Sequence, residues 1–372
     1  MKLVVSGYYG FGNAGDEAML AAVVQHLREV VPDVDIVALS QAPEVTRRMH
    51  GIGAAKRTSL RQVAREIAGA DLFISGSGSL LQDVTSFRSL AYYLGLVAMA
   101  RLMGKPVFFY SQGVGPLGSP WSRLLVRLVA NRATAITVRD EPSCELLRAV
   151  GVRRPPIEVT SDPVFGLDLD ASARRGREIL ACEGIPVSSP IVVVSVRPWD
   201  AGSGHLEAAA LAADQAAGSL GATVVYVPFY KPGDVVASRA AVELMRERSH
   251  VLEGDYSPKE IASIVSDADL VIAMRYHALV FAVAAATPFV AVSYDPKIDG
   301  LLRAVGEKPG ARVAGGRRAA DGEALARRVT EVWARREEMR AALAAARPAL
   351  AGAARKAARL AVETARGRAL PG

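Results

Sequence analysis

The sequence DADLVIAMRYHALVFA, residues 267–282, decides the fold of this chain. An apolar run at 270–273 has the length of a buried strand, and an apolar helical segment begins at His277. A buried strand that turns directly into a helix is typical of parallel α/β sheets. Arg275 and His277 occupy the turn, where the N–H groups and the dipole of a helix favour an anion. The stretch predicts an anion site, and the alternative is that His277 is a structural residue that caps the helix.

Short apolar segments alternate with helical ones on both sides of this stretch, which indicates successive βαβ units. In the N-terminal half we expect strands at 2–6, 35–39, 72–75, 106–111, 135–138 and 157–159, and helices at 16–30, 59–68, 89–103, 120–131 and 141–149. In the C-terminal half we expect strands at 191–196, 223–228, 251–252, 270–273 and 289–293, and helices at 207–219, 234–247, 258–266 and 277–286.

This alternation predicts two Rossmann-like, doubly wound α/β domains, residues 1–166 and 191–310, joined by a polar linker at 167–190. We expect the domains to face each other across a cleft at the carboxyl ends of their strands, where such folds bind ligands. An Ala- and Arg-rich tail, residues 311–372, predicts one or two long helices broken at Pro348.

The composition suits two such domains, because 51% of the 372 residues are hydrophobic. Cys144 and Cys182 have neither metal-ligand nor redox spacing. The apolar run at the N-terminus is shorter than a signal peptide requires, and no run approaches the ~20 residues of a membrane span. We therefore expect a soluble, cytoplasmic protein.

The net charge of +7 belongs to the tail. Residues 311–372 contain 14 Arg and Lys against 6 Asp and Glu, whereas residues 1–310 contain 31 against 32. The tail is either a solvated basic helix or a segment attracted to an anionic membrane surface or polyanionic substrate. Binding of nucleic acid is not expected, because no interleaving of aromatic and basic residues accompanies the charge.

The first expected strand leads into a glycine-rich loop, residues 7–15, whose Gly10, Gly12 and Gly15 formally match G-x-G-x-x-G. We do not expect a dinucleotide there, because Asp16 and Glu17 at the start of the helix would repel a pyrophosphate. Asp16 either caps the helix or, together with Asn13, faces the cleft to bind or deprotonate a hydroxyl group.

Polar residues follow the next strands of the first domain. Small residues at 75–79 allow a ligand to approach the backbone ahead of Gln82 and Asp83, and Gln112 is a candidate to bind a sugar. Arg139 follows another strand. It either pairs with Asp140 or Glu141, or binds a carboxylate or phosphate through two parallel hydrogen bonds.

Cations also follow strands of the second domain, namely Arg197, Lys231 and Lys297. Each is either a surface charge, which we favour for Lys231, or part of the anion site at Arg275. Cations on adjacent loops strengthen the prediction of an anion site. The sequence contains no cluster of carboxylates and histidines that predicts a metal.

Together these residues resemble the polysaccharide pyruvyl transferase family, most closely the bacterial CsaB-type enzymes that act on secondary cell-wall polymers. The resemblance covers most of residues 1–300. It rests on the motifs at 7–17, 76–83, 111–116, 139–143, 161–163, 197–199, 275–278 and 295–297.

The resemblance implies a GT-B-like fold and transfer of pyruvate from phosphoenolpyruvate onto two hydroxyls of one sugar, which forms a cyclic ketal. The implied acceptor is N-acetylmannosamine on a lipid-linked precursor of a polymer that anchors S-layer proteins. The N-terminal domain is expected on the acceptor side and the C-terminal domain on the donor side. Neither a cofactor nor a metal is implied.

Roles follow from the resemblance and from the chemistry of the donor. A histidine can protonate the enol carbon, so we assign His277 as general acid or as assistant to the leaving phosphate. Asp16 is assigned as the base. We assign phosphoenolpyruvate binding to Arg139, Arg275, Lys297 and Arg197, and acceptor binding to Asn13, Gln82, Asp83 and Gln112.

Two alternatives remain at this point. One is a GT-B glycosyltransferase that binds a nucleotide-sugar diphosphate at the same turn. The other is a non-catalytic scaffold that binds a cell-wall glycan at the inner face of the plasma membrane through the basic tail.

Overall fold

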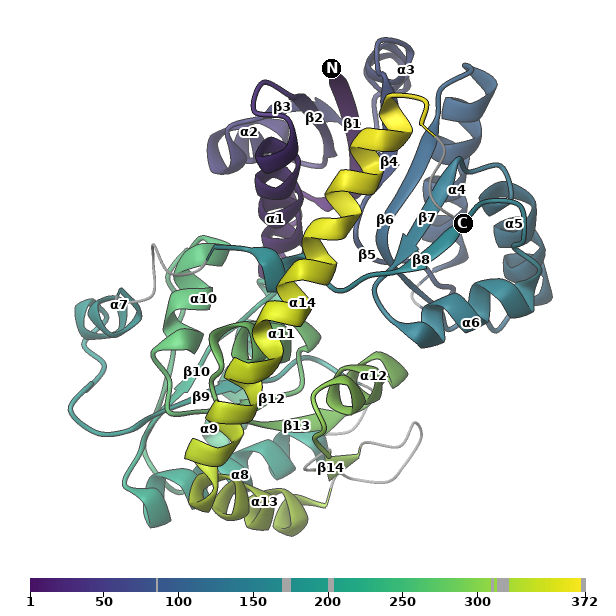
Figure 1. The fold of residues 1–372 in the computed structure, drawn as a ribbon. Helices are drawn as coiled ribbons and strands as arrows, with labels where there is room; N and C mark the ends of the chain where they lie inside the picture. Colours follow the sequence, from purple (N-terminus) through teal and green to yellow (C-terminus); the bar gives the residue numbers. More distant parts are fainter. Residues whose placement is uncertain (85, 169–174, 200–203, 309–310, 313–320, 369–372) are drawn as a thin grey trace. The chain divides into compact units, whose positions relative to one another are not determined.

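The computed structural model divides into two compact units (Figure 1). Unit 1 comprises residues 1–167 and 349–372, and unit 2 comprises residues 168–348. The structure describes residues 1–84, 86–168, 175–199, 204–308, 311–312 and 321–368. Within them, no helix is both long and apolar enough to cross a bilayer.

Unit 1 contains a parallel sheet in the order β3-β2-β1-β4-β6-β7-β8, with β5 also paired to β6. Its strands are β1 (Lys2–Tyr9), β2 (Asp35–Ser40), β3 (Gly53–Lys56), β4 (Leu72–Ser75), β5 (Gly78–Leu81), β6 (Val107–Val114), β7 (Ala135–Val138) and β8 (Ile157–Val159). Its helices are α1 (Ala14–Val30), α2 (Pro43–His50), α3 (Leu60–Ala68), α4 (Phe87–Leu102), α5 (Pro120–Ala130) and α6 (Glu141–Val150), followed by the 3-10 helix η1 (Pro163–Gly166). The winding reverses between β1 and β4, and ligands of doubly wound sheets bind at the carboxyl edge beside such a point.

Two apolar cores cover the two faces of this sheet, because successive residues of a strand point to opposite faces. Val4, Phe73 and Phe109 belong to one core, which α3 to α6 complete. Leu3 and Phe108 belong to the other, which α1 and the end of α14 (Arg336–Ala365) complete.

The C-terminal part of α14 is therefore a structural part of unit 1, and Figure 1 shows it in yellow along the strands. Ala357, Ala361 and Val362 are buried in the core. Two of its cations form ion pairs within the unit, Arg355 with Glu29 at 3.1 Å and Lys356 with Glu158 at 2.6 Å. Some of the basic residues of the tail are therefore paired with carboxylates of unit 1.

The expected break of the tail at Pro348 is wrong. The break lies at Arg335, between α13 (Gly322–Ala334) and α14, and α14 continues through Pro348. A proline inside a helix costs about 3 kcal/mol. Ala-rich turns flank Pro348, and buried residues such as Leu343 and Ala354 hold the helix on either side of it.

Unit 2 contains a second parallel sheet in the order β11-β10-β9-β12-β13-β14. Its strands are β9 (Ile191–Ser195), β10 (Thr223–Tyr226), β11 (Ser249–Val251), β12 (Leu270–Ala273), β13 (Phe289–Ser293) and β14 (Ala311–Arg312). Its helices are α7 (Gly176–Cys182), α8 (Gly204–Leu220), α9 (Gly233–Glu243), α10 (Pro258–Ser266), α11 (Tyr276–Ala285) and α12 (Pro296–Ala304), besides α13. Within the segment 167–190, α7 packs against α10. The prediction of two Rossmann-like α/β sheets with C-terminal helices is confirmed.

Several short elements do not follow from the sequence pattern. β3 reads Gly-Ala-Ala-Lys and β5 reads Gly-Ser-Leu-Leu, so neither shows the alternation or the β-branched residues that indicate a strand. Both form because neighbouring strands pair with them. The other unexpected elements are α2, α12 and β14.

His26 on α1 provides a pH-dependent contribution to the stability of unit 1. It is fully buried beside Gly166, and burial lowers the pKa of its imidazole from the ordinary 6.5. The unfolded chain then binds more protons than the folded one between the lowered pKa and 6.5. The stability is present above pH 6.5 and is lost as the pH falls below it.

His26→Gln is therefore expected to remove part of the decrease in melting temperature on acidification. The measurement compares both proteins roughly one pH unit above and one below 6.5. An identical decrease in the two proteins would contradict this contribution.

Candidate functional site

Three adjacent strands of unit 2 each end before a predicted cation. β9 pairs with β12, and β12 pairs with β13, all in parallel. Arg197, Arg275 and Lys297 therefore follow neighbouring strands at one edge of the sheet, where strands lie about 4.8 Å apart. Met274 donates from its backbone N–H to the carbonyl of Ser195 at 2.8 Å, which holds the start of the Arg275 turn against the end of β9.

Arg275 is fixed by a buried carboxylate that the sequence analysis did not single out. Its Nε donates to Oδ2 of Asp234 at 2.8 Å, and its Nη2 donates to Oδ1. Asp234, which is fully buried on α9, also accepts from the N–H groups of Phe229 at 3.1 Å and Tyr230 at 2.9 Å. This pair orients the guanidinium, and its Nη1 has no protein partner within the described residues.

His277 lies in the first turn of α11, immediately after Arg275 and Tyr276. Among the described residues, no side chain caps this helix and its first turn carries no acidic residue. By contrast, Asp295 caps α12, and Ser257 caps α10. The N-terminus of α11 thus keeps the positive end of its dipole beside an arginine, which favours an anion. The alternative in which His277 caps the helix is not what the structure shows, because the N-cap residue is Arg275.

Arg197 and Lys297 meet at the ring of Tyr294. Nη1 of Arg197 donates to the Tyr294 hydroxyl at 2.9 Å, and its guanidinium lies 5.3 Å from the ring centre of Trp199. Nζ of Lys297 lies 5.9 Å from the Tyr294 ring and 3.1 Å from Oδ2 of Asp295. Among the described residues, the guanidinium of Arg197 bonds to the carbonyl of Pro198 and the Tyr294 hydroxyl and pairs with no carboxylate.

Lys231, by contrast, is engaged by its own surroundings. Its Nζ donates to the carbonyls of Glu253 and Gly254 and to Asp255. These contacts agree with a structural surface charge.

In unit 1, Arg139 forms a cluster with a serine and two aspartates. Its side chain is 3% exposed, and its Nη2 donates to the Ser79 hydroxyl at 3.0 Å. The guanidinium also lies 3.6 Å from the carboxylate of Asp140 and 3.5 Å from that of the buried Asp162. The expected pair with Asp140 is present, and Asp162 is a second partner that the strand pattern did not indicate.

Because Gly113 has no side chain, the guanidinium of Arg139 can lie next to its backbone. A Cβ atom at Gly113 would lie 2.7 Å from Nη2 and 2.8 Å from Cζ. Gly113→Ala is expected to destabilise the protein by about 1–3 kcal/mol, because the buried ion pairs must shift. Gly95→Ala is the control, since nothing lies within 4 Å of its Cβ position on α4. It should be neutral or stabilise the protein by about 0.5–1 kcal/mol. Equal melting temperatures of the two variants would contradict this role of Gly113.

The glycine-rich loop is held by residues other than Asp16. Asn13 caps α1, because its side chain accepts from the N–H of Gly15 at 3.0 Å. Oε1 of the buried Glu17 accepts from Gly10 at 2.7 Å, and its Oε2 lies 2.8 Å from Nε2 of His50. The alternative that Asp16 is the helix cap is therefore wrong.

The segment Gly78-Ser79 brings three predicted residues together. A Cβ at Gly78 would lie 3.5 Å from Oδ1 of Asp16. Gln112 donates its amide N–H to the Gly78 carbonyl and accepts from Ser75, and it is fully buried. Because Arg139 bonds to Ser79, these side chains share the carboxyl edge of the sheet beside the reversal in winding.

Asp83, the residue after Gln82, holds the loop that precedes α5. Its carboxylate accepts from the N–H groups of Gly118 at 2.9 Å and Ser119 at 2.8 Å. Burial acts to raise its pKa, but the hydrogen bonds from the backbone of Ser119 and Gly118 hold the pKa below its ordinary value. Asp83 is therefore an ionised structural anchor.

An arginine that the sequence analysis missed joins the aromatic residues of this edge. The guanidinium of Arg57 lies 5.0 Å from the ring centre of Phe11 and 4.4 Å from that of Tyr92. Phe11 in turn stacks on Tyr8, with ring centres 4.0 Å apart. The signal in the sequence was the pair Tyr8 and Phe11 within the glycine-rich loop, although their partner Arg57, directly after β3, could not be read from it.

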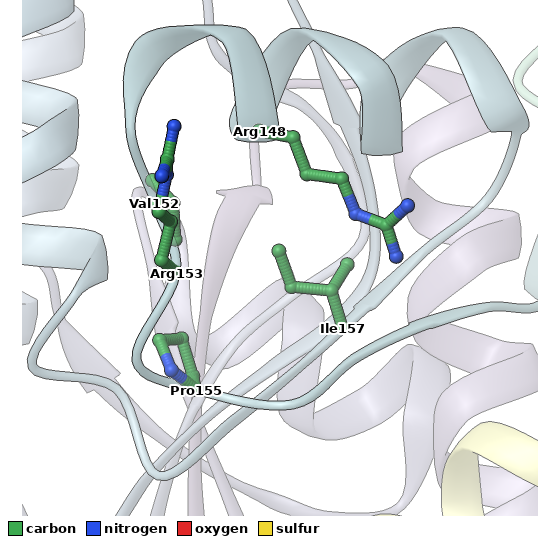
Figure 2. Close-up of a pocket in the computed structure, with 5 residues that line it drawn as sticks. All are labelled: Arg148, Val152, Arg153, Pro155 and Ile157. Carbon is green, nitrogen blue, oxygen red and sulfur yellow. The ribbon is translucent and has the colours of Figure 1, made fainter. Parts of the chain in front are cut away.

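A cavity of about 410 Å³ lies at the opposite edge of the unit 1 sheet, between the end of α6 and the start of β8 (Figure 2). Its lining residues are Arg148, Val152, Arg153, Pro155 and Ile157. None of the predicted site residues lines it. Among the described residues, no group of three His, Cys, Asp or Glu side chains is placed to hold a metal.

Comparison with known proteins agrees with this architecture. The amylovoran biosynthesis protein AmsJ of Erwinia amylovora is 21% identical over 362 residues, covering 82% of this chain and 86% of AmsJ. The UDP-GlcNAc 2-epimerase of Neisseria meningitidis, solved with UDP-GlcNAc, covers 99% of this chain and 100% of its own, with a TM-score of 0.65 at 13% identity. A glycosyltransferase of Rickettsia africae covers 98% of both chains, with a TM-score of 0.64 at 11% identity. These structures establish the fold as GT-B.

The sequence profile of one family, "Polysaccharide pyruvyl transferase", matches residues 13–296. This range contains the glycine-rich loop from Asn13 onward, Arg139, and the Arg275–His277 turn. The chain belongs to the polysaccharide pyruvyl transferase family.

Proposed function

We propose that the protein transfers pyruvate from phosphoenolpyruvate onto two hydroxyls of one sugar, forming a cyclic ketal and releasing phosphate. The observation that carries this proposal is the turn before α11. There, an uncapped helix N-terminus adjoins an arginine that the buried Asp234 holds in place. Membership of the family makes the chain a pyruvyl transferase, and the charge of the turn favours an anionic donor.

Phosphoenolpyruvate carries a carboxylate and a phosphate, so its binding requires several positive groups. Arg275, Arg197 and Lys297 follow three neighbouring strands of unit 2 and supply them. The Nη1 edge of Arg275 and the guanidinium of Arg197 are suited to oxygen atoms of the ligand. The proposal also gives Arg139 a role in binding phosphoenolpyruvate, and within unit 1 Asp162 and Asp140 fix the orientation of its side chain.

The reaction needs one proton at the methylene carbon of phosphoenolpyruvate and two new bonds from sugar oxygens to its C2. We assign delivery of the proton to His277. The first hydroxyl adds to C2, the bond from C2 to the phosphate oxygen breaks, and the second hydroxyl then adds to C2. Of the two hydroxyl protons, one replaces the proton that His277 delivered, and the other leaves with phosphate. Asp16 accepts a proton from an attacking hydroxyl, and the cations offset the charge on the departing phosphate.

The acceptor is assigned to the carboxyl edge of unit 1. Asn13, Gln82 and Asp83 lie in loops at this edge, Asp16 lies in the first turn of α1, and the stacked rings of Tyr8 and Phe11 offer an apolar face to a sugar. We propose N-acetylmannosamine of a lipid-linked cell-wall polymer precursor as the sugar, with the product serving S-layer attachment. Phosphoenolpyruvate is a cytoplasmic metabolite, so the reaction is assigned to that compartment.

Incubation with phosphoenolpyruvate and a synthetic β-N-acetylmannosaminide tests the proposal. In mass spectrometry, the mass of the expected product exceeds that of the acceptor by the mass of pyruvic acid minus the mass of one water molecule. One phosphate should be released for each product molecule. UDP-N-acetylglucosamine as the sole donor should give no product. Transfer of a sugar from that donor, or phosphate release without a ketal, would overturn the proposal.

A further inference from the structure

One segment of unit 1 is entirely free of acidic residues. Between Asp83 and Asp140, residues 84–139 contain no Asp or Glu, although the whole chain contains 38. The same segment carries seven basic residues, namely Arg88, Arg101, Lys105, Arg123, Arg127, Arg132 and Arg139. Apart from Arg139, none of these forms an ion pair with another described residue. This segment itself therefore contributes only positive charge to the surface.

The same segment also exposes apolar side chains. Of the thirteen large apolar side chains exposed among the described residues, seven lie in residues 84–139. Five of them belong to α5 or to the start of α4 and the loop before it: Val84, Phe87, Trp121, Leu124 and Leu128. Isolated exposed apolar residues are ordinary, but a group of them is characteristic of an interaction surface.

On α5 these residues form one stripe. Trp121, Leu124 and Leu128 follow the spacing that places side chains on one side of a helix, and they are 73%, 42% and 54% exposed. The opposite side of α5, including Val126 and Ala130, is buried in the core. Arg123 and Arg127 lie on the solvent face beside the stripe.

The loop before α4 is tied to α5. Asp83 accepts from Gly118 and Ser119, the two residues directly before α5, which ties the neighbouring Val84 to the start of that helix. α4 itself packs beside α5 on the same face of the sheet. The five apolar residues and the adjacent Arg88, Arg123 and Arg127 thus form one basic-apolar surface.

We propose that this basic-apolar surface docks on an anionic lipid bilayer. A tryptophan and aliphatic side chains can enter the boundary between headgroups and acyl chains, and arginines beside them can meet lipid phosphates. Arg88, Arg123 and Arg127 form no ion pair among the described residues, and their positive charge complements the negative charge of such a membrane.

A second copy of the chain fits this surface less well. A two-fold contact would bring the arginines of one copy against the same arginines of the other. Three apolar side chains on one helix also cover far less than the roughly 800 Å² per partner of a stable interface. The tail is a weaker membrane candidate, because Arg355 and Lys356 already pair within unit 1.

The position of the surface suits an acceptor carried by a lipid. Gln82 and Asp83 immediately precede Val84, so the surface begins where the proposed acceptor loop ends. Only this link to the acceptor rests on the proposed function. Binding to lipid rests on the surface alone and can be measured without phosphoenolpyruvate.

The test is co-sedimentation of the full chain with vesicles of equal parts phosphatidylglycerol and phosphatidylcholine, and with phosphatidylcholine alone. The wild type should bind the anionic vesicles, and salt should weaken this binding. Each basic residue near such a membrane contributes about fivefold in affinity. Arg88→Glu with Arg127→Glu should therefore reduce binding at least tenfold, and so should the triple variant Trp121→Gln, Leu124→Gln, Leu128→Gln.

Two matched controls make the result specific. Arg347→Glu with Arg359→Glu makes the same charge change on exposed positions of α14, and Leu211→Gln with Val236→Gln removes exposed apolar residues of unit 2. Both should bind as the wild type does. Failure of the wild type to bind, equal binding by the surface variants, or loss of binding in the α14 control would overturn the proposal. So would a dimer in the absence of lipid that the triple variant dissociates.

A water-soluble acceptor separates this proposal from the proposed function. The surface variants should pyruvylate it at the wild-type rate. Absence of ketal formation by every protein would overturn the proposed reaction and leave the vesicle result standing.

Discussion

Replacing His277 with alanine is expected to lower kcat for phosphate release from phosphoenolpyruvate, measured with acceptor present, by about 10²–10⁴-fold. This is the range that a positioned general acid contributes. The imidazole lies in the first turn of α11, next to Arg275, so its removal leaves the anion site but not the proton donor. The KM for phosphoenolpyruvate should change much less than kcat, because Arg275, Arg197 and Lys297 remain.

His250→Ala is the matched control, since it makes the same chemical change on β11, away from the turn. It should keep wild-type kcat. A His277→Ala protein with unchanged kcat and wild-type melting temperature would remove His277 from the mechanism. A rise in KM alone would instead make His277 a binding residue.

Replacing Asp234 with asparagine is expected to produce the second large effect. Asp234 holds Arg275 through two hydrogen bonds and also accepts from the backbone of Phe229 and Tyr230, all without exposure to solvent. Breaking a buried ion pair by removing one partner costs about 3–5 kcal/mol, because the other charge is left uncompensated. Faster amide hydrogen exchange in residues 229–243 and 274–285 should report the loss, together with a higher KM for phosphoenolpyruvate.

Asp255→Asn provides the comparison for this variant. Asp255 is fully exposed and pairs with Lys231 at 3.0 Å, so the same substitution should leave the melting temperature close to that of the wild type. Adding Arg275→Gln to Asp234→Asn should restore much of the stability, because no charge is then left unpaired, but it should not restore the KM. Recovery of both would show that Arg275 has only a structural role.

The sequence was most informative where one local segment determines the structure. The apolar run at 270–273 and the helix after it could be recognised because a buried strand and an apolar helix lie in one window. Arg275 could be placed at the carboxyl edge for the same reason. Its partner Asp234 could not, because the order β10-β9-β12 brings residues 41 apart in the chain into contact, and this order depends on the whole sheet.

Unit 1 shows a second limit of local patterns. Asp16, Gln112 and Arg139 could be assigned to one edge, since parallel strands end on the same side. Their common contact, the segment Gly78-Ser79, belongs to the short strand β5, which has no strand-like pattern of its own. Arg57 follows β3, another short strand that forms only because β2 pairs with it, so its contact with Phe11 depended on pairing that the sequence does not encode locally.

The packing of the end of α14 into unit 1 determines the order in which the protein can be completed during synthesis. Residues 168–348 are translated without interruption, so every part of unit 2 is present before the chain is finished. Unit 1 begins first but needs Ala357, Ala361 and Val362 to close one face of its sheet. Until these residues leave the ribosome, that apolar face is exposed, and such surfaces promote aggregation of nascent chains. The unit that begins at the N-terminus is therefore the last to be completed.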